Sequence, residues 1–215
     1  MKFWLATANI KRAETCLAYG IFEGIITNPH VVAQEGRDPK ALFKDLCRIA
    51  PYAYYQLHAG EVEAMLAEAE EMLAINPDKM RIKVPATRNG LGVIRRLTDQ
   101  GLRVMATAVP TSTWMVLAVA AGAVAIAPYS GMLQRRNILS KMEGVFDMQS
   151  IIDAQGYDVE ICTGIYDVTE IPRYAAQGIK SAFIWEKDVE AYLTQELVDE
   201  AAANFEDDWA QIDAY

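Results

Sequence analysis

Short apolar runs alternate with helix-like segments along the whole 215-residue chain, and this alternation limits the fold more than any other feature. Eight apolar runs recur at roughly 22- to 28-residue intervals. Regular strand–helix alternation predicts a parallel sheet, because parallel neighbours need a crossover connection. Eight such units predict a closed (β/α)8 TIM barrel. The runs are Phe3–Ala6, Gly24–Pro29, Tyr52–Leu57, Met80–Thr87, Arg103–Val109, Ala123–Tyr129, Val159–Thr163 and Ser181–Trp185.

Helical patterns fill the intervals, and no linker or low-complexity stretch divides the chain. We therefore expect residues 1–215 to form one barrel domain, with residues 195–215 adding a helix at the C-terminus. No glycine-rich phosphate fingerprint follows the first strand, which disfavours an open doubly wound sheet. The expected helices are Ile10–Tyr19, Pro39–Ile49, Glu61–Ile75, Gly90–Gln100, one beginning at Pro110, Asp147–Ala154, Val168–Gln177, Val189–Leu193 and Gln195–Ala210.

The composition indicates a cytoplasmic globular protein without nucleic-acid or membrane partners. The net charge of −9 argues against a polyanionic partner, which requires a basic face. Three cysteines far apart in the chain give no disulfide framework. The N-terminus has no signal-peptide pattern, and the apolar stretch from Trp114 to Ala127 is too short to span a bilayer.

One lysine interrupts the fourth apolar run. Alternation places Lys83 on one face with Arg81 and Pro85, while the other face is apolar. A buried ammonium is costly, so such a lysine lowers its pKa, and the neutral amine is a nucleophile that forms Schiff bases with carbonyl compounds. A lysine that reaches water or pairs with a carboxylate is the alternative.

Polar residues occur at or near the ends of four other predicted strands. These residues are Asn28, Gln56, Thr107 and Tyr129. Each has an ordinary structural explanation, such as a turn or a rim aromatic. In a (β/α)8 barrel, however, the carboxyl ends of the strands meet at one mouth, where reacting groups lie. Together with Lys83 they predict a catalytic site.

Several motifs carry a resemblance to a known family. They are Gly24–Pro29, Ile82–Thr87, Ala106–Val109, Ala127–Tyr129 and Asn204–Trp209. With these blocks the chain resembles, nearly end to end, the small transaldolase family, and in particular the branch of the bacterial fructose-6-phosphate aldolases. The resemblance implies a class I aldolase that needs no metal and no organic cofactor.

The resemblance also implies roles for individual residues. Lys83 would form the Schiff base with the donor, and Gln56, Thr107 and Tyr129 would hold a water that moves protons. The transaldolase branch carries Glu and Phe where this chain has Gln56 and Tyr129, so the chain is similar to the aldolase branch. A tyrosine hydroxyl can exchange a proton, which makes Tyr129 the expected acid/base. Asn28 would bind the donor, and the expected substrate contacts also include Thr27 and Ala127.

Three positions depart from the family pattern. Ala6 stands where the family has an aspartate that binds the donor. The family's phosphate-binding arginine aligns near Met132, and its phosphate-contacting serine aligns with Gly164. The Gly164 N–H can still meet an anion. Arg135 and Arg136 are candidates to replace the arginine, or belong to a solvated loop or subunit contact. These departures favour a small hydroxyketone or simpler carbonyl donor over a sugar phosphate.

Two other functions stay open, namely a transaldolase whose Arg135 or Arg136 holds an anionic sugar, and a non-catalytic carbonyl-binding barrel. The resemblance implies a homo-oligomer, a pentamer or decamer, in which the C-terminal helix packs on a neighbouring subunit. Small carbonyl compounds or sugars are the expected substrates. His30 and His58 lie beside the expected site without a nearby carboxylate partner, which makes a metal site improbable. Cys162 is expected to be a buried thiol, and the acids of 61–71 a solvated helix face.

Overall fold

Eight parallel strands close into a barrel in the order of the sequence, as the alternation predicts. The structure, a computed structural model, describes residues 1–212, so the last three residues of the expected C-terminal helix lie outside the described residues. Each strand pairs with its two neighbours in sequence, and β1 closes the barrel against β8. The strands are β1 (Lys2–Ala6), β2 (Phe22–Ile26), β3 (Ala53–Gln56), β4 (Met80–Pro85), β5 (Val104–Val109), β6 (Ala125–Pro128), β7 (Glu160–Ile165) and β8 (Ser181–Trp185).

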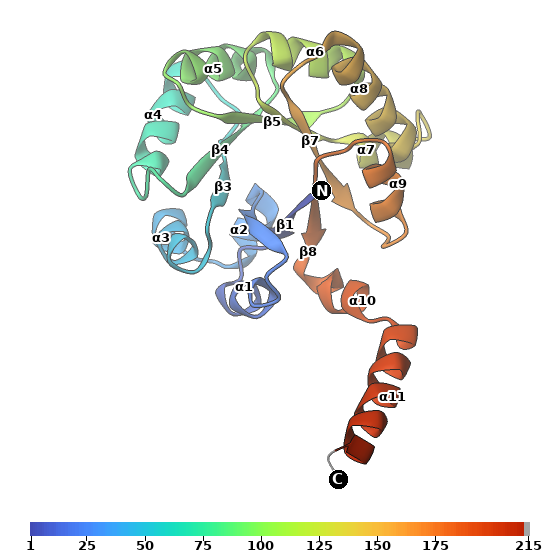
Figure 1. The fold of residues 1–215 in the computed structure, drawn as a ribbon. Coiled ribbons are helices and arrows are strands. Elements are labelled where there is room, and N and C mark those ends of the chain that lie inside the picture. The colour runs from blue at the N-terminus through green and yellow to red at the C-terminus, as the bar shows by residue number, and fades with distance from the viewer. Residues whose placement is uncertain (213–215) are drawn as a thin grey trace.

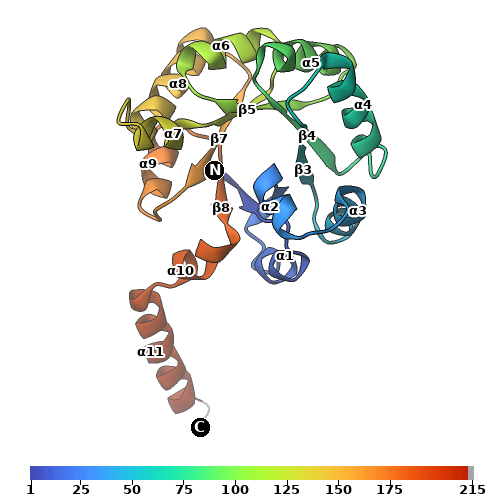
Figure 2. The ribbon, with the colours of Figure 1, turned by 180° about the vertical axis from the view of Figure 1, so that it is seen from behind.

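Helices surround the barrel as an outer layer (Figures 1 and 2). Two short ones, α2 and α7, were not predicted, and α8 begins six residues before its predicted start. The helices are α1 (Ile10–Leu17), α2 (Pro29–Gln34), α3 (Pro39–Ile49), α4 (Val62–Leu73), α5 (Arg88–Asp99), α6 (Ser112–Ala120), α7 (Ser130–Arg135), α8 (Lys141–Gln155), α9 (Glu170–Ala176), the 3-10 turn η1 (Glu186–Asp188), α10 (Val189–Leu193) and α11 (Glu196–Ile212).

The strands separate two apolar cores. Met80, Ile82 and Val84 of β4 pack outward against the helices. A smaller cluster fills the barrel, where Trp4 meets Tyr54 edge to face with ring centroids 4.8 Å apart. The alternation predicted for β4 is therefore confirmed, and Lys83 belongs to the face that points into the barrel.

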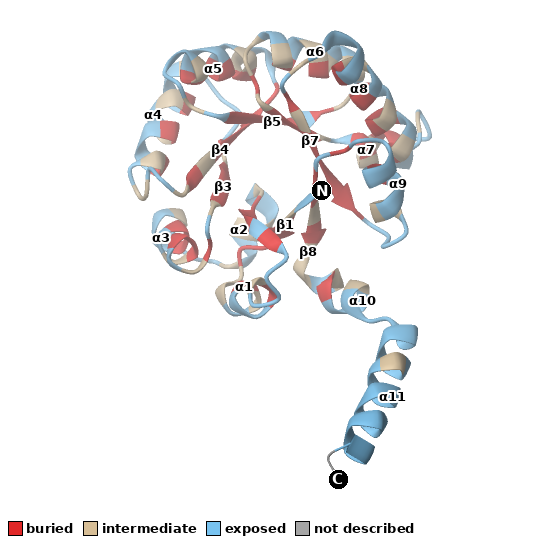
Figure 3. Ribbon diagram, in the orientation of Figure 1, coloured by how far each residue is buried: buried red, intermediate tan, exposed pale blue. Residues whose placement is uncertain are grey.

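The last helix, α11, extends away from the barrel (Figures 1 and 2) and buries none of its residues (Figure 3). Leu197, Phe205, Trp209 and Ile212 recur at helical spacing, and each is more than half exposed. Every charged residue of α11 is an aspartate or a glutamate. In residues 1–212 no helix combines the length and apolar character needed to cross a membrane.

Packing of α11 on a second copy of the chain remains a prediction, and we expect removal of its apolar stripe to lower the molecular mass in solution. An amphipathic helix such as α11 gains most of its stability when its apolar face packs against another part of the structure. Phe205→Ser/Trp209→Ser should shift the species seen by sedimentation velocity toward the 215-residue monomer. Glu206→Gln, in the same helix, is the matched control. An unchanged mass in the double variant would contradict a role of this stripe in assembly.

Candidate active site

Lys83 is the buried cation of the barrel interior. Its side chain is only 5% exposed, and its Nζ donates a hydrogen bond to the Thr27 carbonyl oxygen at 2.8 Å. No ion pair within residues 1–212 includes it. Burial lowers the pKa of Lys83 to about 8. About a tenth of the Lys83 amine is therefore neutral at pH 7, far more than for a lysine of ordinary pKa.

Cys162 is a buried free thiol, as predicted. Burial raises its pKa to about 12, so the sulfur is protonated and supplies no negative charge to Lys83. Lys83 thus lacks a strong counter-charge, which is the condition under which an amine is an available nucleophile.

The segment after β2 is organised by Asn28. Its Oδ1 accepts hydrogen bonds from the backbone N–H groups of His30 and Val31 at 2.9 and 3.1 Å, and Pro29 occupies the first turn. This N-cap begins α2 two residues beyond the strand, so Asn28 does not end β2. The Thr27 hydroxyl donates to the Tyr54 carbonyl oxygen at 2.8 Å, which ties the end of β2 to β3.

The other three predicted catalytic residues lie at the same end of the barrel. Gln56 ends β3 beside Lys83, its register partner in β4. Thr107 lies in β5 and is 7% exposed, while Tyr129 directly follows β6 and is 48% exposed. Ala127 is buried in the inner cluster.

The end of β5 is irregular. Ala108 has a φ of 57°, and the register with β6 shifts between Ala106 and Val109. A left-handed alanine costs roughly 1–2 kcal/mol, and bulges of this kind re-aim side chains next to active sites. The bulge follows Thr107 immediately and therefore sets how that residue meets the mouth.

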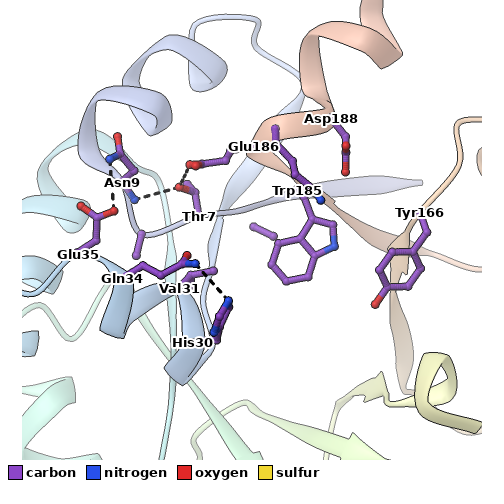
Figure 4. Close-up of a pocket in the computed structure, with 13 residues that line it drawn as sticks. Thr7, Asn9, His30, Val31, Gln34, Glu35, Tyr166, Trp185, Glu186 and Asp188 are labelled. Carbon is purple, nitrogen blue, oxygen red and sulfur yellow. Dashed lines mark hydrogen bonds between the residues drawn. The ribbon is translucent and has the colours of Figure 1, made fainter. Parts of the chain in front are cut away.

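Two cavities open at the mouth, and α2 separates them. One, of about 510 Å³, is lined by α2 together with Ala6, Tyr166 and Trp185 (Figure 4). The other, of about 340 Å³, is lined by the opposite side of α2 with Thr27, Asn28 and Gln56. Lys83 lines neither, but its Nζ bonds to Thr27, a residue of the smaller cavity. The donor contacts predicted from the sequence therefore divide between the two cavities.

Aromatic side chains lie beside Ala6 and Gly164, two of the positions at which the chain departs from the family pattern. Ala6 is the register partner of Trp185, and both lie on the wall of the larger cavity. The Phe183 ring covers Gly164, because a Cβ added there would come within 2.7 Å of the ring. Gly164 is thus buried within β7, and contact of its N–H with a substrate anion remains a prediction.

The two candidate arginines differ in position. Both are exposed at the end of α7, but Arg135 folds back over Gly131, where a Cβ would meet its Nη1 at 3.4 Å and the Tyr166 hydroxyl at 3.7 Å. Arg135 therefore reaches the rim near Tyr166. Arg136 caps α7, and no contact places it at the mouth.

Tyr166 is held by a buried ion pair that sequence reasoning missed. Lys141, 4% exposed, pairs with Glu170 at 2.5 Å, and its ammonium lies 4.2 Å from the centre of the Tyr166 ring. The same Glu170 carboxylate accepts a hydrogen bond from the Tyr166 N–H at 3.0 Å. Burial lowers the pKa of Lys141, and Glu170 opposes that change. Tyr166 and Trp185 follow the strand-end rule used for the other strands, so the rule applied to strands seven and eight could have found both.

His58 does have a carboxylate partner, contrary to the sequence analysis. Its Nδ1 lies 2.6 Å from Glu68, which also accepts from the Tyr55 hydroxyl at 2.7 Å. Glu68 lies ten residues away on α4, so the acids of that helix are not all solvated as predicted. Among the described residues no cluster of three or more potential ligands could hold a metal ion.

Comparison with known proteins agrees with this architecture. Residues 3–170 match the family described as Transaldolase/Fructose-6-phosphate aldolase. The chain is 31% identical to a "Probable transaldolase" of Thermodesulfovibrio yellowstonii over 99% of both chains. It is 30% identical to "Probable transaldolase 2" of Bacillus anthracis over 98% of both, and 31% identical to a "Probable transaldolase" of Alkaliphilus metalliredigens over 97% of this chain and 98% of that one. The protein therefore belongs to the transaldolase/fructose-6-phosphate aldolase family and is an enzyme of that family.

Proposed function

We propose that this enzyme is a class I aldolase that cleaves and forms carbon–carbon bonds through a Schiff base on Lys83. The observation that carries the proposal is a lysine buried inside the barrel with a pKa of about 8 and no ion-pair partner in residues 1–212. Aldolases of this type require a neutral amine close to the working pH. The reaction uses protein groups and water alone.

The proposed cycle begins when the Lys83 Nζ attacks a ketone carbonyl carbon, and loss of water leaves a protonated imine. In the cleavage direction the bond between the α and β carbons breaks, and its electrons pass toward the iminium nitrogen. The proton of the β-hydroxyl passes to the water held by Gln56, Thr107 and Tyr129, the Tyr129 hydroxyl gives its own proton onward as it takes that one so that it stays neutral, and an aldehyde departs. The remaining enamine takes back a proton, and water hydrolyses the imine to free Lys83.

The donor is a small hydroxyketone or a simpler carbonyl compound, as in the fructose-6-phosphate aldolase branch but with altered contacts. Ala6 offers a methyl group beside the Trp185 indole, and Phe183 covers Gly164. Both features support a donor with fewer polar groups than a sugar phosphate.

Borohydride trapping tests the proposal. Hydroxyacetone, dihydroxyacetone and acetone are incubated separately with the protein, reduced and read by intact mass and peptide mapping. We expect the mass of a reduced donor on Lys83 and none after Lys83→Met. Labelling at another lysine, or no adduct with any donor while a mechanistically related aldolase is labelled under the same conditions, would overturn the assignment.

A transaldolase that transfers a unit from an anionic sugar is the second candidate. Two observations favour it, the position of Arg135 at the rim and the relatives named probable transaldolases. Free donor would then not be released without an acceptor. Measuring donor release with and without added aldehyde separates the two functions.

Restoring an acid at position 6 is expected to shift donor preference. A hydrogen bond to a charged group contributes about 1.5–3 kcal/mol, so Ala6→Asp should favour dihydroxyacetone over hydroxyacetone by roughly tenfold or more. The measurement is the ratio of kcat/KM for the two donors with one common aldehyde. Ala6→Asn, of equal size but uncharged, should shift the ratio less. An unmoved ratio in Ala6→Asp would remove residue 6 from the donor site.

A further inference from the structure

The larger cavity at the mouth carries an excess of negative charge. Glu35, Glu186 and Asp188 line it, and its lining also holds Lys187 and His30. Glu186 accepts a hydrogen bond from the Thr7 hydroxyl, and Glu35 accepts one from the Asn9 side chain at 3.3 Å (Figure 4). None of the three carboxylates takes part in the ion pairs of residues 1–212. The three carboxylates outnumber the Lys187 ammonium in this lining, so an anionic group in the cavity would meet net repulsion.

Tyr166 lies across the cavity from Glu35 and Glu186, whereas Asp188 lies on the same side as Tyr166 in the close-up view (Figure 4). Its backbone N–H bonds to Glu170 and its ring lies against the Lys141 ammonium, so one ion pair places the phenol of Tyr166 through two contacts. Burial raises the pKa of Tyr166, which keeps the hydroxyl protonated. Within residues 1–212 that hydroxyl makes no hydrogen bond, which leaves it free to donate to a ligand.

The nearby cations do not turn this wall into an anion site. Lys141 is neutralised by Glu170 and covered by the Tyr166 ring. Arg135 lies over Gly131 at the rim near Tyr166 and is not part of the cavity lining. The walls thus offer a phenol donor at one side and the Glu35 and Glu186 carboxylates at the other, with the Trp185 indole between them and the Asp188 carboxylate on the side of the phenol.

From this arrangement we propose that the larger cavity binds the aldehyde partner of the reaction, that this aldehyde is uncharged and hydroxylated, and that Tyr166 is its specificity-determining residue. The proposal rests on the aldolase function argued above. The Tyr166 hydroxyl donates to a hydroxyl oxygen of the aldehyde, while the carboxylates accept from its hydroxyl groups and repel phosphate. Lys141 and Glu170 are positioning residues that act through Tyr166.

The first test compares two aldehydes that differ in hydroxylation, D-glyceraldehyde and propanal, with one common donor. The wild-type ratio of kcat/KM should favour glyceraldehyde, and Tyr166→Phe should reduce that ratio by about 3- to 10-fold, as expected for loss of one hydrogen bond. The loss should fall mainly on KM. Tyr19→Phe, an exposed tyrosine at the opposite end of the barrel, is the matched control. An unchanged ratio in Tyr166→Phe would overturn the role of Tyr166.

The second test concerns charge. Wild-type protein should prefer glyceraldehyde to glyceraldehyde 3-phosphate, and Asp188→Asn should raise the relative kcat/KM of the phosphate ester by about 3- to 10-fold. Asp188 suits this test because it makes no side-chain cap bond at α10. Asp78→Asn, exposed before β4, controls for net charge. A wild-type preference for the phosphate ester would overturn the proposed substrate class.

Donor trapping at Lys83 requires no aldehyde, so the two proposals fail separately. Trapping without the predicted ratios would refute the cavity assignment and leave the aldolase function intact. Absence of trapping on Lys83 would refute the aldolase function itself, and with it the proposed role of the cavity.

Discussion

Replacing Lys83 with methionine should abolish aldol turnover and, at the same time, stabilise the folded protein at pH 7. Loss of an essential nucleophile lowers kcat by on the order of 10⁵-fold or more, because the remaining groups cannot form the covalent intermediate. Methionine keeps the length and apolar stem of lysine but removes the buried amine, which is 5% exposed. Loss of activity with gain of stability distinguishes a functional lysine from a structural one.

The stability effect has a defined pH dependence. Lys83 has a pKa of about 8 in the folded protein against an ordinary 10.5, and this difference corresponds to about 3 kcal/mol at 1.36 kcal/mol per pH unit. Between these two values the unfolded chain binds the proton that the folded chain has released, so the wild-type free energy of unfolding rises with pH. Below pH 8 both states carry the proton, and the full cost of burying the ammonium is present.

Urea unfolding of wild type and Lys83→Met at pH 7, 8.5 and 10 checks this dependence. The advantage of the variant should be largest at pH 7 and shrink as the pH approaches 10.5. Lys79→Met is the control, since the Lys79 Nζ donates to the Cys47 and Ala50 carbonyl oxygens outside the proposed site. A variant less stable than wild type at pH 7 would show that Lys83 is held by interactions stronger than the cost of its burial.

Tyr129→Phe is expected to lower aldol cleavage by about 10²- to 10⁴-fold while leaving Schiff-base formation nearly intact. A positioned proton-transfer group contributes a factor of this size, and phenylalanine keeps the ring but loses the hydroxyl. Tyr129 follows β6 directly and begins α7, so the ring position should survive the change. Single-turnover cleavage and borohydride trapping, measured on the same preparation, separate the two steps.

Tyr166→Phe provides the comparison for this variant, since Tyr129 lies close enough to Tyr166 to contribute to the raised pKa of the Tyr166 phenol. Tyr129→Phe should reduce kcat for every aldehyde, whereas Tyr166→Phe should act mainly through KM for hydroxylated ones. An unchanged cleavage rate in Tyr129→Phe would transfer the acid/base role to another group at the mouth, with His30 the next candidate.

The barrel was predictable because its signals are local and repeated. Apolar runs of strand length recur eight times, and the alternation in Met80–Pro85 correctly put Lys83 on the face opposite Met80, Ile82 and Val84. Gln56, Thr107 and Tyr129 were located by one topological rule, that strand ends meet at the mouth. The strand-end positions of these residues agree with that rule, while their chemical roles stay predictions.

The short helices and the long-range contacts were not predictable in the same way. Helix α2 has six residues and buries none, so it gives no periodic pattern, and only Asn28-Pro29 marks its start. Glu68 meets His58 across a loop and a helix turn, and Lys141 meets Glu170 across 29 residues. Such pairs depend on tertiary placement, which hydrophobic periodicity does not encode.

The ring of Phe183 over Gly164 constrains the order in which this site can change by mutation. A side chain at position 164 would begin with a Cβ 2.7 Å from that ring, closer than real Cβ contacts allow. Gly164→Ser alone would therefore be disruptive, whereas the same change after Phe183→Leu would enter a space already opened. A hydroxyl at position 164 therefore meets less obstruction when a smaller residue at 183 comes first, since otherwise the Phe183 ring has to move.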